Sequence, residues 1–333
     1  MWALVWLALF NVARADQFCR ALALEGGGSL GAYQVGVMIG LTEVLPGADI
    51  EWNVVTGIST GALNSAGVSQ FAMGQETEMA QFMKNVWLGL NNSKSVFENW
   101  NILGPAYGLI FEPGMYTTAP LRNTLEGLVL HAPLRNVTVG TSNLVTGKFT
   151  NFNESLGREG IIEAVMCSAA PPLYFPPQHF DDTIFVDGGC ITNLDVFSAV
   201  ERCLDVVPDQ SDIIVDMIFC SGAHLAPLPA TKKLTVVDVL NRASAVKSYD
   251  SGMWFVYNAM TAYPQVNYRY IIVPSASMPG GPVPLDFDHQ NLVNEMALGT
   301  SDAHNVVQNG LDPKQMALEW KQTRYNKATS FSR

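Results

Sequence analysis

The chain is poor in charge and lacks a long apolar run. Only 15% of its 333 residues are charged, and 30 acidic residues against 19 basic ones give a formal net charge of −11. With no basic run to offset this balance, the composition argues against a nucleic-acid partner and against docking on anionic lipid by charge. No stretch reaches the ~20 apolar residues that a membrane span needs. Because 48% of the residues are hydrophobic, the chain can bury a large core.

Cysteine is also scarce, and its spacing excludes a common type of metal site. None of the five cysteines forms a C-x-x-C pair, so we expect no zinc site, and we predict no metal or other cofactor. The odd count leaves at least one thiol free, while an exported chain would have room for one or two disulfides. The sequence does not assign their partners among Cys19, Cys167, Cys190, Cys203 and Cys220.

The N-terminus predicts export. A short apolar run, Met1–Phe10, precedes Ala13-Arg14-Ala15, which has the small-x-small pattern that signal peptidase accepts. We therefore predict a signal peptide over residues 1–15 and a secreted protein; the alternatives are a first core strand or a short anchor. Three Asn-x-Ser/Thr sequons are compatible with export, at Asn91, Asn136 and Asn153.

The first elements alternate between strand and helix. A short apolar strand over Arg20–Leu24 precedes a helical pattern from Ala32 to Leu45, and a second strand, Trp52–Thr56, is followed by a helix that opens at Ala62. Such a βαβα order builds a mainly parallel sheet with helices on both faces. Asn91–Pro120 lacks periodicity and indicates a loop or cap. We expect further strands over 137–143, 148–153, 183–186, 213–220 and 268–273, and helices over 161–170, 234–262 and 292–308.

A glycine-rich loop, Gly26-Gly27-Gly28-Ser29-Leu30-Gly31, joins the first strand to the first helix. Free backbone N–H groups at a helix N-terminus favour negative charge, and two functions fit. The loop satisfies G-x-G-x-x-G with Asp49 and Glu51 downstream, as in a dinucleotide site. Alternatively, the N–H groups of Gly27 and Gly28 form an oxyanion hole for an ester carbonyl. We favour the second, because Glu51 precedes the next strand instead of ending it.

The next strand ends in a serine motif. Gly57-Ile58-Ser59-Thr60-Gly61 is a Gly-x-Ser-x-Gly pentapeptide between an apolar strand and a helix, and glycines two before and two after the serine leave room for a sharp turn. The carboxyl ends of neighbouring parallel strands share one crevice, so Ser59 and the glycine loop are predicted to face the same cleft.

Asp187 is the candidate base for Ser59. It ends an apolar strand and is followed by Gly188 and Gly189, which let another group approach closely. A carboxylate desolvated at such a strand end can accept the serine proton. The alternative is an α/β-hydrolase triad of Ser59, Asp187 and either His289 or His304, although such enzymes place more strands before the nucleophile.

These three motifs together resemble those of the patatin-like phospholipases in type, order and approximate spacing, over about Arg20 to Asn193. The resemblance implies a three-layer α/β/α fold and a Ser/Asp dyad without histidine. By that resemblance Ser59 is the nucleophile, Asp187 the general base and Gly26–Gly28 the oxyanion hole. Family members hydrolyse lipid acyl esters without a metal.

We therefore expect a catalytic domain over 16–333, with its motifs within 20–193 and segments 213–310 completing the fold. The predicted function is release of fatty acids from phospholipid or glyceride esters, with lipid as substrate and a peripheral contact to a lipid surface, for which Met253–Tyr257 is the candidate. Two alternatives stay open: a non-catalytic lipid-binding or storage protein on the same scaffold, and a dinucleotide enzyme. Head group and oligomeric state are not readable from the sequence.

Overall fold

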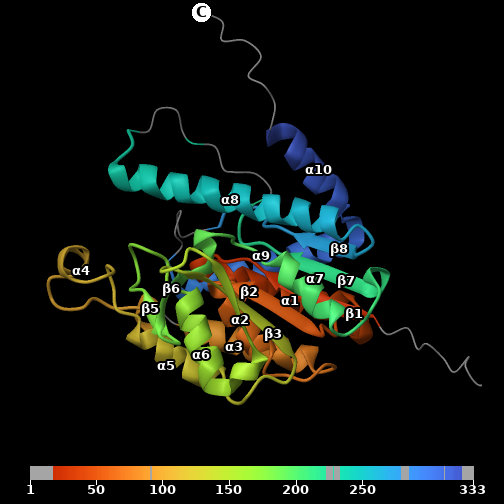
Figure 1. Cartoon of the computed structure of the whole chain (residues 1–333), viewed down its shortest axis with the longest axis horizontal. Coiled ribbons are helices and arrows are strands. Elements are labelled where there is room, and N and C mark those ends of the chain that lie inside the picture. The colour runs from red at the N-terminus through yellow and green to blue at the C-terminus, as the bar shows by residue number, and fades with distance from the viewer. Residues whose placement is uncertain are drawn as a thin grey trace, which may run out of the picture.

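One sheet organises the chain. A computed structural model describes residues 18–90, 92–222, 228, 233–278, 285–310 and 312–324 (Figure 1). Within these ranges eight strands form a sheet of order β5-β6-β3-β2-β1-β7-β8, with β4 also paired to β3. The strands are β1 (Cys19–Leu24), β2 (Val54–Ile58), β3 (Asn136–Asn143), β4 (Phe149–Asn153), β5 (Gln178–Phe180), β6 (Thr183–Asp187), β7 (Ile213–Ile218) and β8 (Asn267–Ile272).

The centre of the sheet is parallel and one end is antiparallel. β3, β2, β1, β7 and β8 run in the same direction, whereas β4, β5 and β6 pair in antiparallel fashion. The carboxyl ends of β1 and β2 therefore lie side by side at one edge of the sheet. Because β6 runs against β3, with Asp187 opposite Thr141, the end of β6 also comes next to the end of β2, where Ile58 pairs with Gly140.

Helices cover both faces of the sheet. α1 (Gly31–Val44), α2 (Thr60–Val68), α3 (Glu76–Gly89), α5 (Ala119–Leu128), α6 (Gly157–Ser168) and α9 (His289–Asn309) contribute to one apolar core. α7 (Val196–Leu204), α8 (Val236–Ala262) and α10 (Pro313–Arg324) contribute to the other. Along β1 the buried side chains alternate, with Leu22 and Leu24 in the first core and Ala21 and Ala23 in the second. The predicted three-layer α/β/α fold with a mainly parallel sheet is confirmed.

The C-terminal third completes this architecture. β7 and β8 extend the sheet beyond β1, and α9 packs along α1. The α1–α9 crossing is close because glycines line it: a Cβ at Gly36 would lie 2.1 Å from the Met296 carbonyl oxygen, and one at Gly299 would lie 2.2 Å from that of Tyr33. The Tyr33 hydroxyl also donates to Asp302, at 3.0 Å. Since α1 follows the glycine loop directly, α9 fixes the position of that loop.

Most predicted elements are present, with boundaries shifted by a few residues. The main difference lies in the segment 91–120, predicted as a loop or cap without regular elements, where the structure has a short helix, α4 (Pro105–Phe111), and the start of α5. Helices α3, α7 and α10 and the short strand β5 were not predicted. Among the described residues, no helix combines the length and apolarity of a membrane span.

A disulfide joins the start of β1 to α7. Cys19 and Cys203 are bonded, whereas Cys167, Cys190 and Cys220 are free. The single bridge falls within the one or two that the sequence allowed. The predicted signal peptide over residues 1–15 and the sequon at Asn91 lie outside the described residues, so export stays a prediction.

Gly36→Ala should destabilise the protein by about 1–3 kcal/mol, because the added methyl group meets backbone that cannot move without separating α1 from α9. Gly127→Ala is the matched control. A methyl group added at this helical glycine would have nothing within 4 Å, so the variant should gain about 0.5–1 kcal/mol. Urea unfolding of the two variants checks this. Equal effects of the two changes would show that the helix crossing is looser than described.

Candidate active site

Ser59 stands on a sharp turn between β2 and α2. Its backbone has φ 55° and ψ −121°, a conformation that normally requires glycine. The glycines on either side are required by contact: a Cβ at Gly57 would lie 2.1 Å from the Gly61 carbonyl oxygen, and one at Gly61 would lie 2.3 Å from that of Leu24. The turn therefore depends on the absence of both side chains.

Ser168 holds the turn from α6. The Ser59 N–H donates to Ser168 Oγ at 2.8 Å, and that hydroxyl donates to the Gly140 carbonyl oxygen at 2.6 Å. Ser168 is fully buried and thus links the Ser59 turn to β3. It stands 109 residues from Ser59, and no local pattern in the sequence indicates this contact.

The amides of the glycine loop differ in their hydrogen bonding. The Gly26 N–H donates to the Asn193 carbonyl oxygen at 3.0 Å, and Asn193 Nδ2 donates back to the Gly26 carbonyl oxygen at 2.9 Å. Gly26 was predicted as part of an oxyanion hole, but its amide is already bonded and cannot serve as a donor. Within the described part of the chain, the N–H groups of Gly27 and Gly28 make no hydrogen bond. These two amides are the ones available to an anion.

Close contacts shape the loop around the serine. A Cβ at Gly26 would lie 3.0 Å from the Ser59 Cβ, and one at Gly27 would lie 2.4 Å from the Cys220 Cβ. Gly28, at φ 58°, begins a short 3-10 turn over Gly28–Leu30, and Gly31 then opens α1, where a Cβ would meet the Thr60 hydroxyl at 2.3 Å. The loop and the Ser59 turn thus lie against each other, as the sheet order predicted.

The buried carboxyl of Glu25 anchors the start of the glycine loop. Glu25 Oε2 accepts the backbone N–H groups of Cys220 and Ser221, at 2.7 and 2.8 Å, which ties the end of β1 to the end of β7. Burial raises the pKa of Glu25 above its ordinary value, and these hydrogen bonds oppose the shift. From α1, Gln34 Nε2 donates to the Glu25 carbonyl oxygen at 2.7 Å. The loop backbone is therefore fixed before any ligand arrives.

Asp187 faces Ser59 from the end of β6. The Ser59 side chain is close enough to lower the pKa of the Asp187 carboxyl, and the Gly189 N–H donates to Asp187 Oδ1 at 2.8 Å. Only 6% of Asp187 is exposed. Burial raises its pKa to about 6, against the lowering effects of Ser59, Gly189 and the nearby Lys247. The carboxyl is thus ionised at neutral pH but basic enough to take a proton.

The glycines after Asp187 are also required by contact. A Cβ at Gly188 would lie 2.5 Å from the Gly140 carbonyl oxygen, and one at Gly189 would lie 2.8 Å from Asn193 Oδ1. Lys247, from α8, donates to the carbonyl oxygens of Gly189 and Cys190. Neither Asn193 nor Lys247 was predicted as part of the site. Asn193 is near Asp187 in sequence but its contact with Gly26 is long-range, and Lys247 reaches the site from the remote helix α8.

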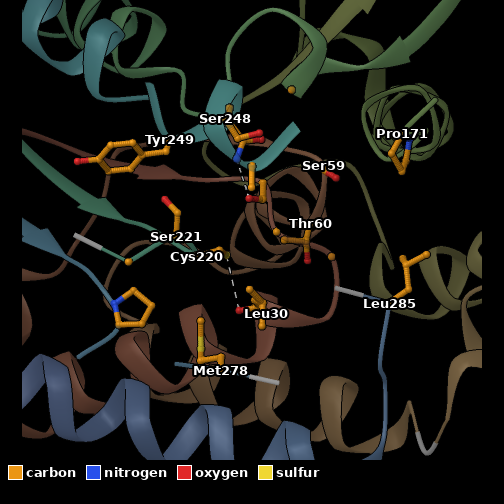
Figure 2. A pocket seen from close by; sticks show the side chains of 18 of the residues that line it. Leu30, Ser59, Thr60, Pro171, Cys220, Ser221, Ser248, Tyr249, Met278 and Leu285 are labelled. Atoms are coloured by element: carbon orange, nitrogen blue, oxygen red, sulfur yellow. Dashed lines mark hydrogen bonds between the residues drawn. The ribbon is translucent and has the colours of Figure 1, made fainter. Parts of the chain in front are cut away.

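A large apolar cavity contains the serine. Its volume is about 1340 Å³, and both Ser59 and Asp187 line it together with Gly26–Gly28. Figure 2 shows the Ser59 hydroxyl in this cavity, with the side chains of Leu30 and Met278 below it. Further apolar lining comes from Leu63, Leu121, Leu173, Phe175, Leu240 and Phe287. The space suits a long hydrocarbon chain better than a small polar substrate.

The described histidines do not line this cavity. His289 is the exposed first residue of α9, and the His304 ring bonds Glu43 at 2.9 Å. No histidine in the described ranges lines the cavity, and His224 lies outside them. The alternative triad of Ser59 and Asp187 with His289 or His304 is therefore not assembled.

The two acidic residues proposed for a dinucleotide site also lie far from the glycine loop. Asp49 lies before β2, at the edge of the sheet opposite the glycine loop, where it pairs with Arg20 at 3.4 Å. Glu51 also precedes β2, so neither carboxylate can meet a ribose bound at the loop.

Met253–Tyr257, the predicted lipid-contact segment, is divided between core and surface. Met253 and Val256 are buried in the core between α8 and the sheet, at 7% and 0% exposure. Trp254 is partly exposed, and its ring packs 6.3 Å from that of Trp320. Phe255 and Tyr257 are half-buried, so lipid contact by this segment stays a prediction.

Replacing Ser59 by glycine should make the fold more stable than replacing it by alanine. Both changes remove the hydroxyl, but only glycine relieves the positive φ at this turn. The greater entropy that a glycine loses on folding offsets part of this gain. We therefore expect the free energy of unfolding of Ser59→Gly to exceed that of Ser59→Ala by about 1 kcal/mol. Urea unfolding of the two variants measures it, and a less stable glycine variant would mean that the turn is not strained.

The fold and site place the chain among α/β proteins with a half-buried serine at a strand-to-helix turn beside a glycine loop. A family model described as "Patatin-like phospholipase" matches residues 22–200. The chain belongs to this family, as the three motifs predicted.

Two curated relatives share the name "cGAMP-activated phospholipase". The one from Escherichia coli (strain TW11681) is 27% identical over 246 residues, which cover 64% of this chain and 66% of the relative. The one from Vibrio cholerae serotype O1 (strain ATCC 39315 / El Tor Inaba N16961) is 26% identical over 196 residues, which cover 52% of this chain and 54% of the relative. The chain thus spans less than two thirds of either relative's length. The crystal structure of VipD from Legionella pneumophila is 12% identical with a TM-score of 0.39, over 91% of this chain and 67% of that one.

Proposed function

We propose that this protein is a lipid acyl hydrolase that releases fatty acids from phospholipid or glyceride esters through Ser59 and Asp187. The observation that carries the proposal is that Ser59 and the buried carboxyl of Asp187, whose pKa is raised to about 6, line one apolar cavity beside Gly27 and Gly28. Membership of the patatin-like phospholipase family supports the choice of lipid as substrate.

In the proposed first step, Asp187 accepts the proton of the Ser59 hydroxyl as Ser59 Oγ attacks the ester carbonyl carbon. The carbonyl oxygen becomes an oxyanion, which the N–H groups of Gly27 and Gly28 stabilise by hydrogen bonding near the N-terminus of α1. The carbon–oxygen bond to the alcohol then breaks, and the leaving oxygen takes the proton from Asp187. An acyl ester on Ser59 and a free alcohol or lysolipid result.

In the second step, Asp187 takes a proton from water, and the resulting hydroxide equivalent attacks the acyl carbonyl carbon. The bond to Ser59 Oγ breaks, the proton returns to Ser59, and the fatty acid leaves. Burial of Asp187 serves both steps, because a carboxylate in water is too weakly basic to hold the serine proton. No step requires a group beyond this chain and water.

A non-catalytic lipid-binding or storage protein is the alternative that shares this scaffold. It needs the apolar cavity but no activated serine, so reactivity of Ser59 separates the two. The names of the two relatives describe activation by cGAMP, which is a property of those proteins. An ester hydrolysis assay with and without cGAMP would test whether this protein is activated in the same way.

Labelling with a fluorophosphonate probe should occur on Ser59 and should disappear in Ser59→Ala, together with hydrolysis of a soluble short-chain ester. The matched control is Ser211→Ala, because the Ser211 hydroxyl also bonds a carboxylate, Asp209 at 2.9 Å, but on the exposed surface. Peptide mass spectrometry locates the label. A folded wild-type protein without labelling would favour the non-catalytic alternative.

The rate constant kcat/KM for a soluble ester should rise with pH through a midpoint near 6 and level off above it. Asp187 acts as a base only when ionised, and burial raises its pKa to about 6, so activity is lost as the pH falls through that value. Asp187→Asn should abolish turnover at every pH. His289→Gln and His304→Gln should keep both the rate and the midpoint, whereas loss of activity in either would restore the triad.

A further inference from the structure

One loop of the protein carries a concentrated apolar surface. Residues 99–114, which include α4, expose five large apolar side chains within ten residues, at 54% to 102% exposure: Ile102, Leu103, Leu109, Ile110 and Phe111. From Asn99 to Phe111 this loop has no charged residue. Figure 1 shows α4 and its loop extending away from the layers at one end of the molecule. Single exposed leucines are ordinary, but such a cluster marks a binding surface.

The base of this loop is attached to the wall of the cavity. Glu98 and Thr117 pair across it with two backbone hydrogen bonds of 3.1 and 3.0 Å. Met115 and Tyr116, which lie between the loop and Thr117, donate their N–H groups to the carbonyl oxygens of Leu173 and Tyr174, at 3.0 Å each. Leu173 and Tyr174 line the cavity that contains Ser59. Met115 and Tyr116 therefore connect the exposed loop to the wall of the cavity in which ester cleavage is proposed.

The N-terminal half of α8 presents a second apolar surface at the cavity. Val236, Val239 and Leu240 are 76%, 51% and 54% exposed, and Leu240 also lines the cavity. Val246 continues the same helical spacing at 44% exposure. In Figure 1 this half of α8 extends past the sheet toward the end of the molecule where α4 lies. By contrast, the C-terminal half is packed, as the burial of Val256 shows.

We propose that loop 99–114 and the N-terminal half of α8 dock the protein on the surface of an electrically neutral lipid bilayer. This inference rests on the proposed function, because it supplies the path by which a water-insoluble ester reaches the cavity. Charge decides which lipid surface fits. The chain has a net charge of −11, and loop 99–114 has no basic residue to attract an anionic head group. On the N-terminal part of α8 the basic Arg242 and Lys247 are matched in number by Asp238 and Asp250. The docking surface therefore has no net positive charge, and apolar insertion is the source of affinity. Zwitterionic phosphatidylcholine is the matching surface.

Cosedimentation with phosphatidylcholine vesicles tests this docking, in the Ser59→Ala background so that lipid is not consumed. Ile102→Asp with Ile110→Asp, which change the two most exposed of the five apolar side chains, should reduce vesicle partitioning by about tenfold or more, since each change removes an apolar side chain from the bilayer and adds a charge. Val236→Asp should also reduce it, and an aspartate suits the first turn of α8. Raising the salt concentration should not weaken binding.

Leu134→Asp is the matched control. Leu134 is 55% exposed but precedes β3, at the edge of the sheet opposite the cavity, so this change should leave vesicle binding as it was. Thermal unfolding verifies that each variant is folded. Equal binding by the folded loop variants and the control, or binding that requires anionic lipid, would overturn the proposal.

A second copy of the chain is the other occupant that such a surface admits. Sedimentation equilibrium without lipid separates the two: a dimer that Ile102→Asp with Ile110→Asp converts to monomer would make this face a dimer interface and overturn the docking proposal. Failure of the proposed function is measured separately, by hydrolysis of a soluble short-chain ester by the unmodified protein. Vesicle binding without ester hydrolysis would support the docking surface and contradict the proposed hydrolase function.

Discussion

The site depends on one steric constraint, the close approach of backbone to backbone around Ser59. Gly57 and Gly61 have no room for a Cβ against each other or against the end of β1. Only this closeness lets the chain turn from β2 into α2 within one residue, at a positive φ that Ser59 would not adopt alone. The same contact brings the glycine loop, which follows β1, against the serine. Ser59 and the glycine-loop amides are thus positioned by a single packing arrangement.

Electrostatics then distinguishes the two carboxyl groups near this turn. Glu25 and Asp187 are both buried, and burial raises the pKa of each. Glu25 is held by backbone N–H groups at the end of β7, so it serves as a structural link beneath the loop. Asp187 lies close enough to Ser59 for that side chain to lower its pKa, and it lines the cavity. The positions of the two strand ends, more than the residue type, decide which carboxylate is suited to move a proton.

The sequence predicted those parts of the site whose cause is local. Strand, glycine loop, helix and serine turn follow one another within about forty residues, and each has a composition that indicates its shape. Long-range contacts could not be predicted in this way. Gly26 belongs to the glycine motif, but its amide is occupied by Asn193, 167 residues away. Ser168 and Lys247 also act on the site from remote helices, and α4 was missed because its apolar residues face outward instead of packing on a core.

A crystal structure of the protein after reaction with a phosphonate inhibitor tests the central claim most directly, because the phosphonyl oxygen occupies the place of the oxyanion. The account predicts phosphorus bonded to Ser59 Oγ and the phosphonyl oxygen about 2.7–3.1 Å from the backbone nitrogens of Gly27 and Gly28. Phosphorus on another residue, or a phosphonyl oxygen directed away from both amides, would contradict it.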